Sequence, residues 1–177
     1  MAVFVTVGTT SFDELIERVN SFAFHSAIMR LGYDTLFVQY GNGSIEPSTD
    51  SLDPSNADFL ECRQSNSILK VHAFRFHDNL GEFFSRCELV ISHGGAGTCL
   101  ESLTPPGRRK LVIVINEALM HNHQLELAAA LYMRKHAFVT RPSDLISFLM
   151  TGQQRIFPEL PVSQGATRLF SSFLSSP

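Results

Sequence analysis

The feature that most constrains the fold of this chain is a set of short runs that are apolar at nearly every position. Three of them are "VFVTV" at 3–7, "LVISH" at 89–93 and "LVIVIN" at 111–116. A strand with one face in solvent would alternate apolar and polar residues, so these runs predict strands that are buried on both faces. Strands of this kind build parallel sheets that are covered by helices.

Segments with helical periodicity separate the apolar runs. Ser11 and Glu14 have the S-x-x-E spacing of a capping box, and apolar residues then recur at helical intervals up to a stop at Gly32. The other expected strands are 35–41, 68–76 and 137–140, and the other helices are expected from Asp78, from Thr98 and over 123–135. The alternation predicts an α/β, Rossmann-like fold with a mostly parallel sheet and helices on both faces.

Composition narrows the class of protein. The chain has 177 residues, is 44% hydrophobic and 18% charged, and carries a net charge of −3, which is ordinary for one globular domain and gives no general attraction to nucleic acid. No apolar run approaches the roughly 20 residues of a membrane span, and the N-terminus lacks the pattern of a signal peptide. Three cysteines without motif spacing (Cys62, Cys87 and Cys99) fit a reducing compartment, so we expect a cytoplasmic location.

Three polar segments follow three of the expected strands. They are "GTTS" at 8–11, "HGGAGT" at 93–98 and "NEALMHNHQ" at 116–124. Ligands of parallel α/β sheets bind beyond the carboxyl ends of the strands. We therefore expect the three segments to converge on one crevice.

The glycine-rich segment suggests a phosphate cradle. Gly94, Gly95, Gly97 and Thr98 stand at the expected start of a helix, where free backbone N–H groups can hold a diphosphate. The alternative is a tight turn that serves packing only. The dinucleotide fingerprint is not met, because Leu100 stands where its third glycine would be, and the Gly-Lys-Ser/Thr of a kinase-type loop is absent.

Two further groups of polar residues flank this loop. Glu101 can accept hydrogen bonds from a ribose diol, or can simply stabilise the helix start by its charge. Thr9 and Thr10 can offer hydroxyls to a phosphate, although capping of the first helix by Ser11 would explain their segment equally well.

The third segment offers hydrogen-bonding groups suited to a sugar. Asn122, His123 and Gln124 can meet hydroxyls and an acetamide, or can form a capped polar loop. His121 and His123 have a spacing seen in metal and nuclease sites, but no further Cys, Asp or His cluster completes such a site, so we expect no metal.

The three motifs taken together resemble a known family. "VTVGTTSFDELI", "LVISHGGAGTCLESL" and "LVIVINEALMHNHQLELAAALY" are similar to the catalytic subunits of the UDP-N-acetylglucosamine transferase of the dolichol pathway. Those enzymes add the second N-acetylglucosamine to dolichol-diphosphate-N-acetylglucosamine. The resemblance runs from residue 3 to about 140, and a more distant one links the chain to the carboxyl-terminal donor domain of the bacterial transferase that makes lipid II.

The resemblance implies the donor-binding half of a two-domain GT-B glycosyltransferase. UDP-N-acetylglucosamine would be the donor, with no cofactor and no metal. The acceptor half would be a separate membrane-anchored subunit that presents a lipid-linked sugar and holds this chain at the cytosolic face of the endoplasmic reticulum. Residues 1–140 would form the nucleotide-sugar-binding domain, and residues 141–177 a helical extension of it that can dock on the partner.

The resemblance also assigns roles to residues. Gly94, Gly95, Gly97 and Thr98 would line the diphosphate, Thr9 and Thr10 would face phosphate, Glu101 would hold the ribose, and Asn122, His123 and Gln124 would face the transferred sugar. His93 is a local candidate for the general base, but a structural role is as good an interpretation, and in the bacterial relative the base is thought to lie on the acceptor half. The polar insertion at 41–58 and the region after 140 depart from the family.

Several alternatives stay open. The chain can be a stand-alone UDP-sugar transferase for another acceptor, or a non-catalytic nucleotide-sugar-binding regulatory subunit, whereas the missing fingerprint argues against a Rossmann oxidoreductase. The tail at 161–177 has one apolar stripe at helical spacing, formed by Ala166, Leu169, Phe170, Phe173 and Leu174. This stripe packs on its own domain, docks on the acceptor subunit, or does both.

Overall fold

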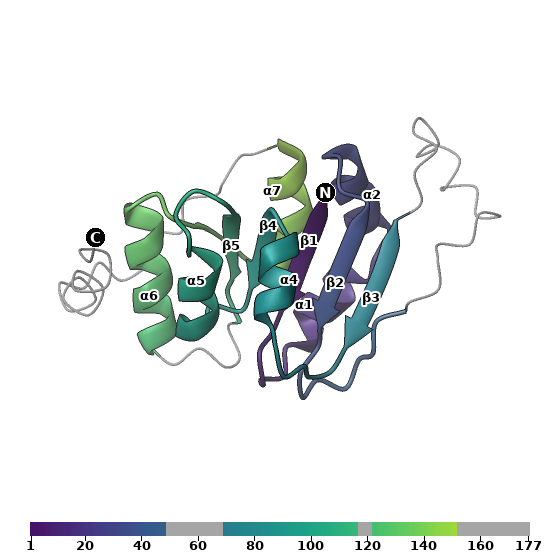
Figure 1. The fold of residues 1–177 in the computed structure, drawn as a ribbon, viewed down its shortest axis with the longest axis horizontal. Coiled ribbons are helices and arrows are strands. Elements are labelled where there is room, and N and C mark those ends of the chain that lie inside the picture. Colours follow the sequence, from purple (N-terminus) through teal and green to yellow (C-terminus); the bar gives the residue numbers. More distant parts are fainter. Residues whose placement is uncertain (49–68, 117–121, 152–177) are drawn as a thin grey trace.

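The computed structural model describes residues 1–48, 69–116 and 122–151. The strands of these residues form one parallel sheet in the order β3-β2-β1-β4-β5-β6 (Figure 1). Their bounds are β1 Ala2–Thr6, β2 Thr35–Gln39, β3 Lys70–Phe74, β4 Leu89–Ser92, β5 Lys110–Val114 and β6 Phe138–Thr140. This strand order is that of a doubly wound, Rossmann-like sheet, and it confirms the predicted fold class.

Helices cover both faces of the sheet. One face carries α1 (Asp13–Val19), α2 (Phe22–Arg30) and α7 (Leu145–Thr151), and the other carries α4 (Gly81–Arg86), α5 (Ala96–Ser102) and α6 (Asn122–Met133) (Figure 1). A short 3-10 helix, η1 (Pro142–Asp144), leads into α7. The central strands β1, β4 and β5 are therefore buried on both faces, which is the physical reason for their uninterrupted apolar runs, whereas the edge strand β3 is only partly buried.

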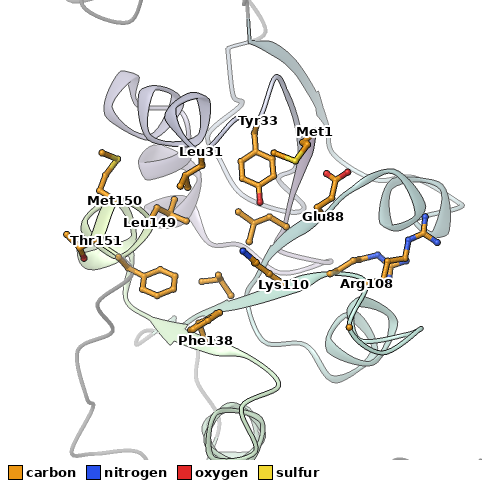
Figure 2. Close-up of a pocket in the computed structure, with 15 residues that line it drawn as sticks. Met1, Leu31, Tyr33, Glu88, Arg108, Lys110, Phe138, Leu149, Met150 and Thr151 are labelled. Atoms are coloured by element: carbon orange, nitrogen blue, oxygen red, sulfur yellow. The ribbon is translucent and has the colours of Figure 1, made fainter. Parts of the chain in front are cut away.

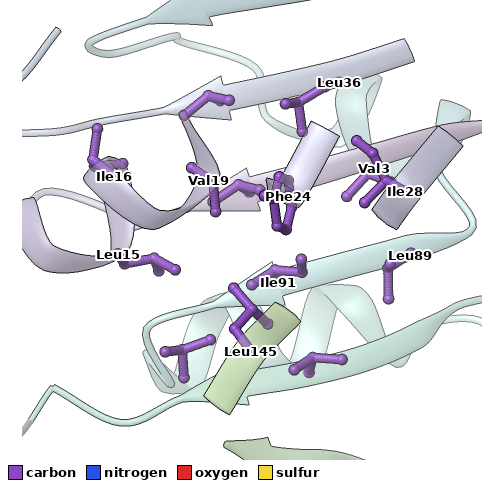
Figure 3. Packing of buried hydrophobic residues seen from close by; sticks show 14 of the residues in the cluster. Val3, Leu15, Ile16, Val19, Phe24, Ile28, Leu36, Leu89, Ile91 and Leu145 are labelled. Atoms are coloured by element: carbon purple, nitrogen blue, oxygen red, sulfur yellow. The ribbon is translucent and has the colours of Figure 1, made fainter. Parts of the chain in front are cut away.

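Alternation along β1 divides the core into two clusters. Val3 and Val5 point to the face of α1, α2 and α7, where they pack with residues such as Ile16 and Leu145 (Figure 3). Phe4 points the other way, into a cluster that contains Phe83 and Phe84 of α4. All of β1 is buried, so a single strand contributes to both layers of the core.

The predicted first helix is wrong in two respects. It is divided at Asn20 and Ser21, and the Ser21 hydroxyl caps α2 by accepting a hydrogen bond from the Phe24 N–H at 3.3 Å. Ser11 does not cap α1, because Phe12 occupies the cap position and no side chain bonds there. Phe12 is buried in the core, so burial of its ring fixes where α1 begins. The predicted stop at Gly32 is confirmed: α2 ends at Arg30 and Gly32 has a φ of +88°.

The starts of two other helices also differ from the prediction. Asp78 does not cap α4, since Leu80 holds the cap position without a side-chain hydrogen bond. The helix α5 begins at Ala96, two residues before Thr98, with Gly95 in the cap position. Phe83 and Phe84 anchor the first turn of α4 in the core, whereas Ala96 and Gly97 in the first turn of α5 are exposed and Cys99 is the first buried residue of that helix.

The region after 140 is described as far as Thr151. Leu145, Phe148 and Leu149 of α7 are buried in the same cluster as α1 and α2. The predicted tail helix at 161–177 and residues 49–58 of the polar insertion lie outside the described residues. No helix in the described part of the chain has both the length and the apolar character that crossing a bilayer requires.

Candidate functional site

A pocket of about 360 Å³ opens at the carboxyl edge of the sheet. The strand order reverses between β1 and β4, and the loops that follow these two strands diverge at that point. The residues that line the pocket are Thr9, Thr10, Ser11, Asn42, His93, Asn116 and Gln124. They come from all three of the segments expected to meet there, so the predicted convergence is confirmed.

The loop after β1 is held in place by hydrogen bonds that leave one hydroxyl free. The Thr10 hydroxyl donates to the Val7 carbonyl at 2.8 Å. The Asn42 side chain donates to the Thr9 carbonyl at 2.8 Å, and the Asn42 N–H donates to the Thr10 carbonyl at 3.1 Å. The exposed Thr9 hydroxyl has no hydrogen-bond partner in the described part of the chain. Of the two threonines, Thr9 is thus the one free to donate to a ligand.

A buried network lies beneath this loop. The Thr6 hydroxyl donates to the Gln39 side-chain oxygen at 2.6 Å and accepts from the Gly8 N–H at 3.1 Å. Gly8 has a φ of +62°, a conformation that favours glycine. The turn out of β1 is therefore preorganised before any ligand arrives.

The imidazole of His93 is packed between two glycines. A Cβ atom at Gly8 would lie 2.9 Å from the His93 Cε1, and one at Gly95 would lie 2.7 Å from the His93 Nε2. His93 Nδ1 lies 3.3 Å from the Thr6 carbonyl, and because a carbonyl only accepts, Nδ1 carries the proton. Burial lowers the pKa of His93, and the hydrogen bond to Thr6 opposes this only in part. The side chain is therefore neutral at pH 7, with an unprotonated Nε2.

This packing gives Gly95 a structural role that the sequence did not indicate. A side chain at position 95 would displace the His93 ring, so the fold itself requires glycine there. Gly97 is different, because no atom lies within 4 Å of the place where its Cβ would be, and the residue is exposed. Gly94 has a φ of +85°, which favours glycine for conformational reasons. Of the glycines in this loop, Gly97 is thus the one whose lack of a side chain the fold does not require.

His25 and His93 predict how stability depends on pH. Burial lowers the pKa of His25, whose ring nitrogens have no hydrogen-bond partner of good geometry and are only partly compensated by the Val19 carbonyl. Both histidines resist protonation in the folded state but take up a proton when unfolded, at a pKa of 6.5. We expect the free energy of unfolding to be retained above pH 6.5 and to fall as the pH drops below that value.

Urea denaturation between pH 5 and 8 measures this dependence. A pKa that is lower by one in the folded state than in the unfolded state lowers the free energy of unfolding by about 1.4 kcal/mol at acidic pH. The variant His25→Leu should show a shallower loss than the wild-type chain. An unchanged slope in that variant would show that His25 does not contribute.

The opposite wall of the pocket carries two amide side chains. The Asn116 amide approaches the Ser11 carbonyl at 3.4 Å and so links the end of β5 to the loop after β1. Gln124, in the first turn of α6, is half-buried and also lines the pocket. The helix α6 begins at Asn122, but the side chains of Asn122 and His123 lie outside what the structure describes. Their predicted contact with a sugar stays a prediction.

Glu101 and Thr98 do not line this pocket. Glu101 is exposed, and its Oε1 lies 3.4 Å from where a Cβ of Gly81 would be, beside the start of α4. Thr98 is half-buried in the first turn of α5. The structure therefore brings together Thr9, Thr10, His93 and Gln124 and places Glu101 farther along α5. The assignment of Glu101 to a ribose is still a prediction.

Asn42, Asn116 and Ser11 line the pocket but were not among the predicted site residues. Each follows an apolar strand or its turn: Asn42 stands in "YGNG" after β2, and Asn116 closes "LVIVIN". Polar residues at the carboxyl end of a buried strand were the signal that could have identified them.

The described residues contain no group of three or more His, Cys, Asp or Glu side chains that could hold a metal ion. The thiols of Cys87 and Cys99 are buried, and burial raises the pKa of each to about 12. These two cysteines are accordingly poor nucleophiles, and the chemistry of the pocket rests on hydroxyl, amide, imidazole and backbone groups.

A comparison with protein families identifies the family of this chain. The model of the glycosyltransferase family 28 C-terminal domain matches residues 2–156. The chain belongs to this family. The match includes the six strands and the residues that line the pocket.

Curated relatives share the family 28 domain. The human UDP-N-acetylglucosamine transferase subunit ALG13 is 43% identical over 77% of this chain, which spans 11% of that protein. The mouse protein of the same name is 38% identical over 89% of this chain, which spans 13% of it. The protein of that name from Yarrowia lipolytica is 33% identical, and the match covers 91% of this chain and 77% of the relative. This chain thus spans about a tenth of the two mammalian relatives.

Solved structures support the fold of the family 28 domain. A solution NMR structure of ALG13 matches 98% of this chain and 94% of its own, with a TM-score of 0.59 at 22% identity. The crystal structure of Acinetobacter baumannii MurG matches 98% of this chain and 41% of its own, with a TM-score of 0.53 at 18% identity. At these identities the likeness shows the fold alone, which is the Rossmann-like fold of one half of a GT-B glycosyltransferase.

Proposed function

We propose that this chain is the donor-binding subunit of a transferase that moves N-acetylglucosamine from UDP-N-acetylglucosamine to dolichol-diphosphate-N-acetylglucosamine. The observation that carries the proposal is the polar pocket at the reversal of strand order in a family 28 domain. Nucleotide ligands of doubly wound sheets bind at this point.

The diphosphate would lie along the start of α5. The cap position of α5 has no side-chain hydrogen bond, so the backbone N–H groups of its first turn are free to donate. The open space beside Gly97 lets phosphate oxygens come close to the backbone, and Thr9 lines the pocket at the same carboxyl edge of the sheet. Such preorganised donors can stabilise the charge of a departing diphosphate without a metal.

The sugar and the ribose would bind on opposite sides of the diphosphate. Gln124 lines the pocket and is suited to hydroxyl and acetamide groups of the sugar, together with Asn122 and His123. Glu101 is exposed farther along α5, where a ribose diol of a nucleotide laid across the helix start would meet its carboxylate. The placement of Glu101 outside the sugar pocket fits this division of roles.

The reaction would invert the anomeric carbon. The acceptor hydroxyl forms a bond to C1 of the sugar as the bond from C1 to the UDP oxygen breaks, and the hydroxyl proton passes to a general base. Because His93 is neutral and its Nε2 is unprotonated, it has the right protonation state for this role. It is only 8% exposed and its ring is packed between glycines. These features favour a structural role for His93 and a base supplied by the acceptor subunit.

The acceptor half would come from a partner. The curated relatives carry the word "subunit" in their name. We propose a membrane-anchored partner that binds the lipid-linked sugar and keeps this chain at the cytosolic face of the endoplasmic reticulum. Residues 1–140 would then be the nucleotide-sugar-binding domain, and the helical extension after it would contribute to assembly.

Two substitutions test the division of roles in the donor site. Glu101→Ala should weaken UDP and UDP-N-acetylglucosamine alike, because both contain the ribose. Gln124→Ala should weaken only the sugar nucleotide. A hydrogen-bonded charge contributes on the order of 2 kcal/mol, or roughly thirtyfold in affinity. Isothermal titration calorimetry measures the affinity for each ligand. If Gln124→Ala lowered the affinity for UDP as much as that for UDP-N-acetylglucosamine, the assignment would be contradicted.

A reconstitution experiment tests the proposed function as a whole. UDP-N-acetylglucosamine should bind in preference to UDP-glucose and NADH, and transfer to the lipid-linked acceptor should appear only when the membrane-anchored partner is added. Transfer by this chain alone to another acceptor would favour a stand-alone enzyme. Binding without transfer in every combination would favour a regulatory nucleotide-sugar-binding subunit.

A further inference from the structure

A second pocket, of about 700 Å³, lies at the edge of the sheet opposite the donor pocket. It opens where the amino ends of β4, β5 and β6 meet α7 and the segment after α2 (Figure 2). We call it the amino-edge groove. Its walls include Leu31, Tyr33, Leu89, Phe138, Phe148 and Leu149.

The amino-edge groove gathers exposed apolar side chains. Met1, Leu31, Phe138 and Met150 all line it and are 55%, 44%, 43% and 43% exposed. Single exposed apolar side chains are common on soluble proteins, but a contiguous group of them around a hollow marks a surface that something covers.

Three of the four charged side chains on the rim are held by the backbone of the chain itself. Glu88 accepts a hydrogen bond from the Ala2 N–H at 2.8 Å, Arg108 donates to the Ser85 carbonyl at 2.6 Å, and Arg109 donates to the Phe84 carbonyl at 2.6 Å. Lys110 forms no ion pair within the described residues. The apolar walls are therefore the main feature of the groove, and they suit an apolar segment with few charges.

We propose that residues 163–174 of the same chain occupy the amino-edge groove as an amphipathic helix. Thr151 lines the groove, so the chain that follows it departs from the wall of the groove itself. Residues 152–162 can span up to roughly 35 Å when extended, which is ample for a return to the groove. A helix over 163–174 would be about 18 Å long.

The sequence of this segment matches the groove. Its apolar stripe (Ala166, Leu169, Phe170, Phe173 and Leu174) would face the exposed methionines and Phe138, while its serines would face solvent. Arg168 is its only charged residue. So short a helix is marginal alone, but its attachment to the groove gives an effective concentration on the order of millimolar, so weak contacts suffice to seat it.

Methionine methyl groups provide a direct test. Met1 and Met150 line the groove, whereas Met29 and Met133 do not and serve as internal controls. The full chain is labelled at the methionine methyl carbons, and its NMR spectrum is compared with those of two variants. One variant is truncated after Leu160, and the other carries Phe170→Ser together with Phe173→Ser. We expect the signals of Met1 and Met150 to shift in both variants. Met29 and Met133 should not move. The matched control Ser171→Ala with Ser172→Ala alters the polar face and should leave all four signals in place.

Each result decides the proposal. Shifts that do not depend on protein concentration, and that are reversed when a peptide of residues 161–177 is added in excess to the truncated chain, would support it. Identical Met150 signals in the full and truncated chains would overturn it. So would shifts that grow with protein concentration, which indicate a second copy in the groove, or shifts that appear only on addition of the membrane partner. UDP binding at the opposite edge should be the same in all variants, so the outcome is separate from that of the donor site.

Discussion

Replacing Gly97 by valine should abolish tight binding of UDP while the protein remains folded. The structure has no atom within 4 Å of a Cβ at this position, so the fold accommodates the new side chain. Valine also has no lower helix propensity than glycine, so α5 should not be weakened. The side chain would instead occupy the space that we assign to the diphosphate. Loss of the hydrogen bonds to phosphate should cost about 3 kcal/mol, or roughly a hundredfold in affinity by calorimetry.

The neighbouring glycine provides the contrast for this prediction. Gly95→Val should destabilise the protein, because even a Cβ at position 95 would lie 2.7 Å from the His93 Nε2 and would force the ring out of its place. Thermal denaturation should therefore show a lower midpoint for Gly95→Val and an unchanged midpoint for Gly97→Val. Wild-type affinity for UDP in a folded Gly97→Val protein would remove the phosphate cradle from the proposed function.

Phe4→Ala should cause a large loss of stability. Phe4 is fully buried in β1, and its ring lies 5.5 Å from that of Phe83 and 5.2 Å from that of Phe84, measured between ring centroids. Truncation would leave a cavity between β1 and α4, at the centre of one of the two core layers. Such substitutions cost about 3–5 kcal/mol, against a total stability on the order of 5–15 kcal/mol for a domain.

Phe76→Ala is the matched control. Phe76 is 49% exposed, so the same truncation should change the free energy of unfolding by less than about 0.5 kcal/mol. Urea denaturation followed by circular dichroism compares the two variants directly. Similar losses for Phe4→Ala and Phe76→Ala would show that the aromatic cluster around β1 does not carry the stability assigned to it.

The sequence by itself determined the fold class and the edge of the sheet where the site lies. Runs such as "LVIVIN" are apolar on both faces because helices cover both faces of the sheet. This pattern can be recognised from a few consecutive residues, without knowledge of the tertiary structure. Polar segments after these runs could be assigned to one crevice because parallel strands all end at the same edge. The family also followed from three motifs in order, and the match over residues 2–156 confirmed it.

Helix boundaries were decided by tertiary contacts. The capping pattern at Ser11 was a valid local signal, yet burial of Phe12 placed the start of α1 one residue later. A local pattern is worth about 1 kcal/mol, whereas burial of a large side chain contributes about 1.5–3 kcal/mol. The core therefore overrides the capping pattern at the start of α1.

The roles of individual glycines were also decided only by the tertiary structure. In the sequence, Gly95 and Gly97 are equivalent members of one glycine-rich loop. In the structure, Gly95 makes room for His93, which is held by Thr6 from a strand 87 residues away in the chain, and Gly97 faces open space. Asn42 is a second example: it lies in the loop after β2, and its side chain reaches the site through a hydrogen bond to the Thr9 carbonyl. Contacts between distant segments set these distances, and no local pattern in the sequence records them.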